Sequence, residues 1–327
     1  MNTAGPVLEL EDLKTFFYTH EGVARAVNGV GISLSRGEIL GVVGESGCGK
    51  SLTALSILRL VPHPGRIVSG AIRLGGSNLI DLSEKQMRKI RGDRISMIFQ
   101  EPMISLNPAF TIENQLVEAV QAHRQVTRTD AVDRAIEMLK LVEIPAPERR
   151  IKDYPHQLSG GMRQRVMIAE ALLLDPEVLL ADEPTTALDV TIQAQILDIM
   201  YRLNQDTGTA IILITHNLGL VAESANRVVV MYAGKVVEEG PAVAIFDCAG
   251  HPYTQGLLRS LPKPRRSLLG KKAPLYEMSG IVPSLFDLPT GCAFHPRCPS
   301  AKEICRQHES PMFETEPCHF ARCWLFE

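Results

Sequence analysis

The sequence has no apolar run long enough to cross a membrane. Its hydrophobic stretches fall short of the ~18–20 residues that a membrane-spanning helix needs. Residues 1–6 also lack the basic segment followed by an apolar one that marks a secretory signal. We therefore expect a chain that stays in the cytosol and associates with a membrane only through a partner.

The sequence also has no excess of basic charge and few aromatic residues. Lys and Arg number 34 against 37 Asp and Glu, so the formal net charge is −3, and aromatic residues make up 5% of the chain. Proteins dedicated to nucleic acids usually carry a basic face, so we expect no nucleic acid as a partner. The length of 327 residues allows one large or two modest domains.

A phosphate-binding loop (P-loop) is the strongest motif that the sequence does contain. Residues 44–51 have the spacing G-x-x-x-x-G-K-S and lie between an apolar strand pattern at 39–43 and a helix pattern at 52–58. Glycines let backbone N–H groups turn toward a phosphate chain, and the helix adds its N-terminal dipole. Lys50 is expected on the β- and γ-phosphates and the Ser51 hydroxyl on Mg²⁺. The expected nucleotide contacts of this loop are Gly44, Glu45, Ser46, Gly47, Cys48, Gly49, Lys50, Ser51 and Leu52.

Two aromatic residues precede the P-loop. Phe17 and Tyr18 follow a predicted strand at residues 7–13, and a second strand is predicted at 26–34. Either ring could stack on an adenine base, whereas packing in the core or at a sheet edge is the alternative for both. The sequence leaves these two interpretations open.

Two carboxylates, Asp182 and Glu183, end another predicted strand, at residues 178–183. In an open α/β sheet the carboxyl ends of the strands face the ligand crevice. Asp182 is therefore expected to hold Mg²⁺, and Glu183 to polarise the attacking water as the general base.

Two further predicted strands end at the same crevice. Gln100 follows the strand at 95–99 and is a candidate ligand of Mg²⁺ or of water, with an ordinary surface glutamine as the alternative. His216 follows the strand at 210–214 and is placed to reach a γ-phosphate, with a structural histidine as the alternative.

A second phosphate-binding surface is predicted far along the chain from the first. Ser159 is a natural N-cap, and Gly160 and Gly161 expose backbone N–H groups at the start of a helix that runs to Leu174. An ordinary capped helix is the alternative, which the spacing alone leaves open. Residues 112–142 have a helical pattern and indicate a helical insertion in the α/β core.

Taken in order, these motifs resemble those of the ATP-binding subunits of ABC transporters over about residues 7–246. The resemblance rests on the P-loop, the Q-loop residue Gln100, the signature Leu158–Gln164, the Walker B strand with Asp182, the catalytic Glu183, the D-loop Ala187–Asp189 and the switch residue His216. A narrower resemblance is to the dipeptide and oligopeptide permease ATPases. It rests on Gln100–Pro108, Ala181–Thr191, His251-Pro252-Tyr253-Thr254, Gly291-Cys292 and Pro296-Arg297-Cys298.

The resemblance implies an α/β fold, a P-loop NTPase core with a helical subdomain. The nucleotide-binding domain is expected at residues 1–250, with the helical subdomain at about 100–157. Residues 251–327 are expected to form a small, loop-rich and cysteine-rich C-terminal extension.

The resemblance also implies an ATPase that uses ATP and Mg²⁺ to import di- or oligopeptides. Two ATPase subunits face head to tail, and the P-loop of one and the Ser159-Gly160-Gly161 helix start of the other hold ATP between them. Gln164 and Asp189 belong to the implied nucleotide contacts, and Gln100 to the implied Mg²⁺ ligands with Ser51 and Asp182.

The implied partners lie at the cytoplasmic face of the cell membrane, where the chain would be peripheral. They are a second ATPase subunit of related sequence, two transmembrane permease subunits and an extracytoplasmic solute-binding protein. Import of another solute, such as a nickel chelate or a sugar, and an ABC ATPase without a transport role are the alternatives.

The seven cysteines are unevenly placed, because five of them lie in residues 292–327. In a cytosolic chain such a cluster indicates a metal site more often than disulfides. Zinc sites usually carry a tight C-x2–4-C pair, and the wider spacing of these cysteines favours an iron–sulfur cluster. The resemblance implies a [4Fe–4S] cluster, with zinc and free thiols as alternatives. Its implied ligands are Cys292, Cys298, Cys305 and Cys323, with Cys318 as a possible substitute and His319 nearby.

Overall fold

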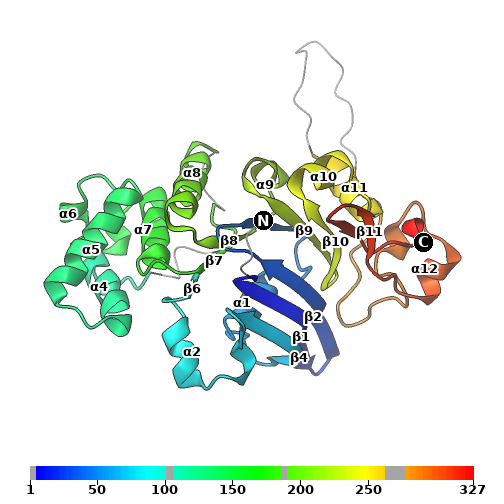
Figure 1. The fold of residues 1–327 in the computed structure, drawn as a ribbon, viewed down its shortest axis with the longest axis horizontal. Helices are drawn as coiled ribbons and strands as arrows, with labels where there is room; N and C mark the ends of the chain where they lie inside the picture. Colours follow the sequence, from blue (N-terminus) through cyan, green and yellow to red (C-terminus); the bar gives the residue numbers. More distant parts are fainter. Residues whose placement is uncertain (1–4, 101–105, 186–189, 262–276) are drawn as a thin grey trace, which may run out of the picture. The chain divides into compact units, whose positions relative to one another are not determined.

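The computed structural model describes residues 5–100, 106–185, 190–261 and 277–327, without the side chains of residues 190 and 191. The chain forms two compact units whose segments alternate along the sequence (Figure 1). The first unit comprises Met1–Glu9, Ser33–Ile39 and Ala71–Ile214, and the second comprises Leu10–Ile32, Leu40–Gly70 and Thr215–Glu327. The domain boundaries expected from the sequence stay predictions.

Three parallel strands form the centre of the first unit. Strand β7 (Val178–Asp182) lies between β6 (Ile95–Ile98) and β8 (Ala210–Ile214) and pairs with both. Every residue of β7 and β8 is buried, and strands covered on both faces have the continuous apolar runs that the sequence shows here. These three predicted strands are confirmed.

Helices make up most of the remaining first unit, and α4, α5 and α7 pack against one another (Figure 1). Thr111 and Thr127 begin α4 and α5, because each hydroxyl accepts a backbone N–H of the first turn. The helical pattern predicted at 112–142 is confirmed. Besides the three parallel strands, this unit contains α2 (Glu84–Ile90), α4 (Ile112–His123), α5 (Arg128–Leu141), α6 (Pro147–Arg150), α7 (Gly160–Leu172), α8 (Val190–Thr207) and the short strand β5 (Ser77–Asn78).

The second unit carries the P-loop between β3 (Ile39–Val43) and α1 (Lys50–Ile57). Strand β3 pairs in parallel with β9 (Arg227–Tyr232), which forms a hairpin with β10 (Lys235–Pro241). In another sheet, β1 lies between β2 and β4. Strands β1 (Leu8–Thr19) and β2 (Gly22–Leu34) are longer than the strands predicted at 7–13 and 26–34. Strand β4 spans Gly65–Leu74, and the unit also holds α9 (Leu218–Ser224) and α10 (Ala242–Asp247).

The C-terminal segment adds strands to the sheet that carries the P-loop. Strand β12 (His319–Ala321) pairs antiparallel with β10, and β11 (Phe313–Glu316) pairs with β12. This segment also contains α11 (Pro252–Arg259) and α12 (Glu303–Gln307). In Figure 1, α11 and β11 lie near β10, and α12 lies farther out, near the C-terminus. None of the helices in the described part combines the length and the apolar composition that a membrane crossing requires.

Backbone packing leaves no room for a side chain at the last glycine of the P-loop. Gly49 has a φ of 104°, and a Cβ placed on it would overlap the Ala26 carbonyl oxygen of β2. The Gly234 N–H, in the β9–β10 turn, donates to the Cys48 carbonyl at 2.9 Å. Strand β2 and this turn therefore brace the loop from outside.

We predict that Gly49→Ala destabilises the protein more than Gly47→Ala does. Both glycines have positive φ (104° and 77°), so both substitutions carry backbone strain, but a Cβ on Gly47 would meet no atom within 4 Å. The extra loss at Gly49 is expected at about 1–3 kcal/mol in the free energy of unfolding, on the scale of other local backbone strain. Urea denaturation without nucleotide measures the loss in the free energy of unfolding. Equal losses in both variants would show that the packing of Gly49 against β2 adds no cost beyond backbone strain.

The Glu170 carboxyl group on α7 lies in an environment that disfavours its ionised form. Burial, and then the charge of Glu118 on α4, raise the pKa of Glu170 from 4.5 to about 7. Between these two pH values the folded protein keeps a proton that the unfolded chain has lost. The folded state therefore loses stability as the pH rises through this window.

We predict that Glu170→Gln stabilises the protein at pH 8 by about 1–3 kcal/mol and leaves it nearly unchanged at pH 4.5, because glutamine needs no deprotonation. Chemical denaturation at the two pH values measures the difference. Glu223→Gln, at an exposed position, is the matched control and should show no such dependence. A Glu170→Gln gain of equal size at both pH values would mean that ionisation is not the cause.

Candidate functional site

The P-loop lysine is folded back over its own loop. Lys50 is 6% exposed, and its Nζ donates to the carbonyl oxygens of Gly44 at 2.7 Å and Glu45 at 3.0 Å. The Cys48 Sγ lies 3.5 Å from the same nitrogen. Burial raises the pKa of the Cys48 thiol, against the opposing charge of Lys50, so this side chain stays neutral. The ammonium thus lies over the loop whose N–H groups would receive phosphates.

Two predicted catalytic residues of the first unit are in direct contact. The Gln100 Nε2 donates to the Glu183 Oε2 at 3.0 Å, although the two residues are 83 positions apart. Glu183 has a left-handed φ of 47°, and its backbone N–H donates to the Ile214 carbonyl of β8 at 2.8 Å. A strained non-glycine residue at a strand end is a common feature of functional sites. The neighbouring Asp182 ends β7 and is 4% exposed.

The signature segment begins α7 as the sequence predicts. The Ser159 Oγ accepts the Met162 N–H at 3.3 Å and caps the helix. A Cβ placed on Gly160 would meet no atom within 4 Å, so the backbone at this helix start is open. Gln164 is buried, and its Nε2 donates to the Pro184 carbonyl in the turn after β7. Its predicted contact with nucleotide stays a prediction.

The remaining predicted nucleotide contacts lie mostly in the second unit. His216 is exposed. Tyr18 is 38% exposed, and the Arg66 guanidinium covers one face of its ring at 4.1 Å from the centroid. Phe17 is partly buried, beside Gly65. Asp189 lies outside the described residues.

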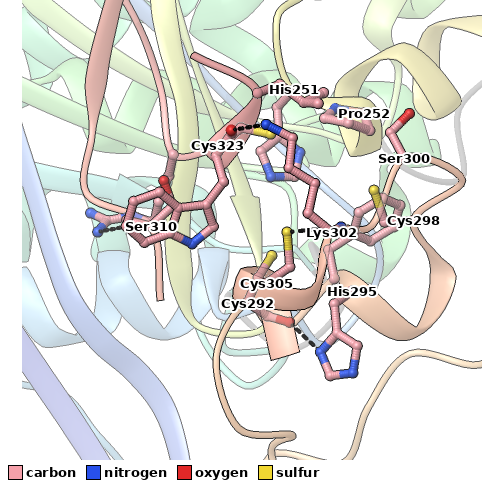
Figure 2. A pocket seen from close by; sticks show the side chains of 14 residues that line it. His251, Pro252, Cys292, His295, Cys298, Ser300, Lys302, Cys305, Ser310 and Cys323 are labelled. Atoms are coloured by element: carbon pink, nitrogen blue, oxygen red, sulfur yellow. Dashed lines mark hydrogen bonds between the residues drawn. The ribbon is translucent and has the colours of Figure 1, made fainter. Parts of the chain in front are cut away.

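The four cysteines predicted as cluster ligands line a single pocket of the second unit (Figure 2). Burial first, and then the neighbouring Cys305, Cys323 and Cys298, raise the pKa of Cys292 to about 11. The Lys302 backbone N–H donates to the Cys305 Sγ at 3.4 Å. Cys318 is exposed and is not among the lining residues.

The cysteine side chains of this pocket are grouped less closely than the ligands of a formed metal site. Among the residues that the structure describes, no three His, Cys, Asp or Glu side chains are grouped closely enough to hold a metal ion. The donor set nevertheless fits an iron–sulfur cluster in its chemistry, since four thiols face one partly buried pocket. The His251 imidazole beside them is neutral, because burial lowers its pKa to about 3.

Two residues that contact the P-loop were missed at the sequence level. Tyr253 and Arg297 both bond to Glu45, across 208 and 252 positions of sequence. They lie in two of the C-terminal motifs that carry the family resemblance, but those motifs indicate no contact partner. Only the folded structure brings them to the loop.

Two protein-family models match this chain, one in its nucleotide-binding part and one in its C-terminal part. The model of the family described as "ABC transporter" matches residues 27–186, and that described as "Oligopeptide/dipeptide transporter, C-terminal region" matches residues 237–305. The chain is 53% identical over 319 residues to the probable peptide ABC transporter ATP-binding protein y4tR of Sinorhizobium fredii, covering 97% of this chain and 94% of that protein. It is 49% identical over 303 residues to the dipeptide transport ATP-binding protein DppD of Haemophilus influenzae, covering 93% and 91%.

Solved structures agree with this placement. The dimeric bacterial ABC transporter cassette MJ0796 matches with a TM-score of 0.65 and 29% identity, over 72% of this chain and 98% of that one. The same cassette bound to ADP and Pi, in a post-hydrolysis state, matches with a TM-score of 0.65 and 28% identity over the same shares. The predicted P-loop NTPase fold of the ABC type is therefore confirmed, and the chain belongs to the ATP-binding proteins of the ABC transporter family, in the oligopeptide/dipeptide group.

Proposed function

We propose that this chain is the ATP-hydrolysing subunit of an importer for di- or oligopeptides. The observation that carries the proposal is the similarity to two peptide transport ATP-binding proteins, at 53% and 49% identity over nearly the whole chain. The match to the oligopeptide/dipeptide C-terminal region extends it beyond the nucleotide-binding part. Nickel chelates and sugars are the alternative cargoes, which the uptake experiment below separates.

The proposed chemistry assigns one role to each polar group. Lys50 would exchange the carbonyl oxygens of Gly44 and Glu45 for the β- and γ-phosphate oxygens. Glu183 would accept the proton of the attacking water as general base. Gln100 would orient that carboxylate, which is the contact observed at 3.0 Å. His216 would bind the γ-phosphate, and either Phe17 or Tyr18 would stack on the adenine.

Mg²⁺ would neutralise charge on the phosphates. Ser51, Asp182 and Gln100 are the proposed ligands, with hydroxyl, carboxylate and amide oxygens of the kind that Mg²⁺ prefers. The open helix start at Ser159, Gly160 and Gly161, together with Gln164 and Asp189, would bind the nucleotide held by a second ATPase subunit of related sequence.

The other proposed partners are two transmembrane permease subunits and, through them, an extracytoplasmic solute-binding protein. A pocket of about 230 Å³ in the first unit is lined by residues of β6, α4 and α7 and is a candidate seat for a cytoplasmic helix of the permease. Phe99, at its edge, is 40% exposed and offers an apolar contact. Docking there would hold the chain at the cytoplasmic face of the membrane.

We further propose that Cys292, Cys298, Cys305 and Cys323 hold a [4Fe–4S] cluster. The four thiols line one pocket of a segment with little regular structure, where such a cluster would supply a structural cross-link. Zinc in place of iron is the alternative.

We predict that the purified protein is brown and contains iron and acid-labile sulfide. Cys292→Ser should lose both, because it removes a pocket-lining thiol, whereas Cys318→Ser should keep both, because Cys318 is exposed and outside the pocket. Elemental analysis after anaerobic purification measures this. Zinc without iron in the wild-type protein would contradict the cluster.

We predict that Glu183→Gln binds MgATP but loses about 10²–10⁴-fold in hydrolysis rate, the range typical of a general base. In cells, the same variant should abolish uptake of a labelled dipeptide or oligopeptide while permease subunits still co-purify with the chain. Glu316→Gln, at an exposed position, is the matched control.

The two readouts test different claims. Normal ATP turnover by Glu183→Gln would refute the role of that residue. In cells that carry Glu183→Gln, peptide uptake at the normal rate together with loss of nickel-chelate or sugar uptake would refute the proposed cargo. The proposed ATPase role would remain intact.

A further inference from the structure

Two residues of the C-terminal region bond to Glu45 of the P-loop, one to its backbone and one to its side chain. The Glu45 backbone N–H donates to the Tyr253 hydroxyl oxygen at 2.8 Å. Its carboxylate accepts a bidentate pair from Arg297, with Nη1–Oε2 at 2.7 Å and Nη2–Oε1 at 3.0 Å. Both the main chain and the side chain of this loop residue are therefore held from outside the loop.

Arg297 is fixed more firmly than an ordinary surface arginine. Its side chain is 4% exposed, and that of Glu45 is 25% exposed. The guanidinium also donates from Nε to the Ser279 carbonyl at 3.2 Å and from Nη1 to the Tyr232 hydroxyl at 3.3 Å. Bidentate pairs with little exposure combine geometric specificity with weak solvent screening, so this pair holds the carboxylate in one orientation.

Tyr253 is held equally firmly by aromatic packing. It is fully buried, and its ring centroid lies 4.6 Å from that of Tyr232 and 5.4 Å from that of Phe294. The His251 Nδ1 accepts the Tyr253 backbone N–H at 3.0 Å and caps α11. The hydroxyl that receives the Glu45 N–H therefore has a fixed position.

The charge of Glu45 makes this contact relevant to nucleotide binding. A carboxylate within a loop that receives a phosphate chain repels the ligand unless a cation neutralises it. The carbonyl of the same residue accepts the Lys50 ammonium at 3.0 Å, so a displaced Glu45 would also displace the lysine. Arg297 both neutralises the carboxylate and fixes the residue.

We propose that Arg297 and Tyr253 are positioning residues of the ATP site, through which the C-terminal region sets the conformation and the charge of the P-loop. The proposal rests on the proposed function, in which this loop binds ATP. A loop that is already ordered loses less conformational entropy when it binds a ligand. Removal of either contact is therefore expected to weaken ATP binding without unfolding the chain.

The test is the affinity of the full-length protein for MgATP, measured by isothermal titration calorimetry. Arg297→Gln should raise the Kd about tenfold or more, since it leaves the Glu45 carboxylate unpaired. The double variant Glu45→Gln/Arg297→Gln should recover most of that loss, because it removes the repelling charge. Arg259→Gln, an exposed arginine on the helix that carries Tyr253, is the matched control and should bind as the wild type does.

The outcomes distinguish a positioning role of Arg297 in the ATP site from a purely structural role of its ion pair with Glu45. Wild-type affinity in Arg297→Gln would overturn the proposal, and so would a loss that the double variant does not recover. If Arg297→Gln fails to fold, Tyr253→Phe and Arg297→Lys replace it: each should weaken MgATP binding at least threefold, and wild-type affinity in both overturns the proposal. A wild-type protein that binds no MgATP would instead refute the proposed function.

Discussion

The arrangement of the second unit depends on one buried carboxylate, Glu238 of β10. It is fully buried and accepts the N–H groups of Gly250, at 2.5 Å, and His251, at 3.1 Å, while the His319 Nε2 lies 2.8 Å away. A carboxylate removed from water is costly unless its oxygens are satisfied, so these partners must stay in place. They fix β12 beside β10 and the start of α11, which carries Tyr253 to the P-loop.

The C-terminal region is therefore part of the structure that supports the P-loop. Its strand extends the sheet that contains β3, and its aromatic and basic side chains reach Glu45. The cysteine pocket shares Phe294 with the aromatic group around Tyr253. A group bound in that pocket would thus lie one side chain away from the residues that hold the loop. The residues proposed for water activation, Gln100 and Glu183, belong to the other unit and are positioned by its parallel strands.

Local signals in the sequence predicted the local structure well. The P-loop, the Ser159 cap and the buried strands at 178–182 and 210–214 were predictable because glycine spacing, capping and continuous apolar runs act over a few residues. The pairing of β12 with β10 was not predicted, since strand pairing depends on distant partners and short polar strands have a weak pattern. The contacts of Tyr253 and Arg297 with Glu45 were missed for the same reason. The spacing of residues along the sequence does not indicate which distant residues form a hydrogen bond or an ion pair.

We infer that the C-terminal region orders the P-loop before nucleotide arrives. Hydrogen–deuterium exchange of the Glu45 amide, in the full-length protein without nucleotide, tests it most directly, because exchange requires the bond to the Tyr253 hydroxyl to open. We expect Tyr253→Phe to accelerate exchange at Glu45, while the amides of β7 exchange at the wild-type rate. Equal protection of Glu45 in the wild type and in Tyr253→Phe would show that the Tyr253 hydroxyl does not order the loop.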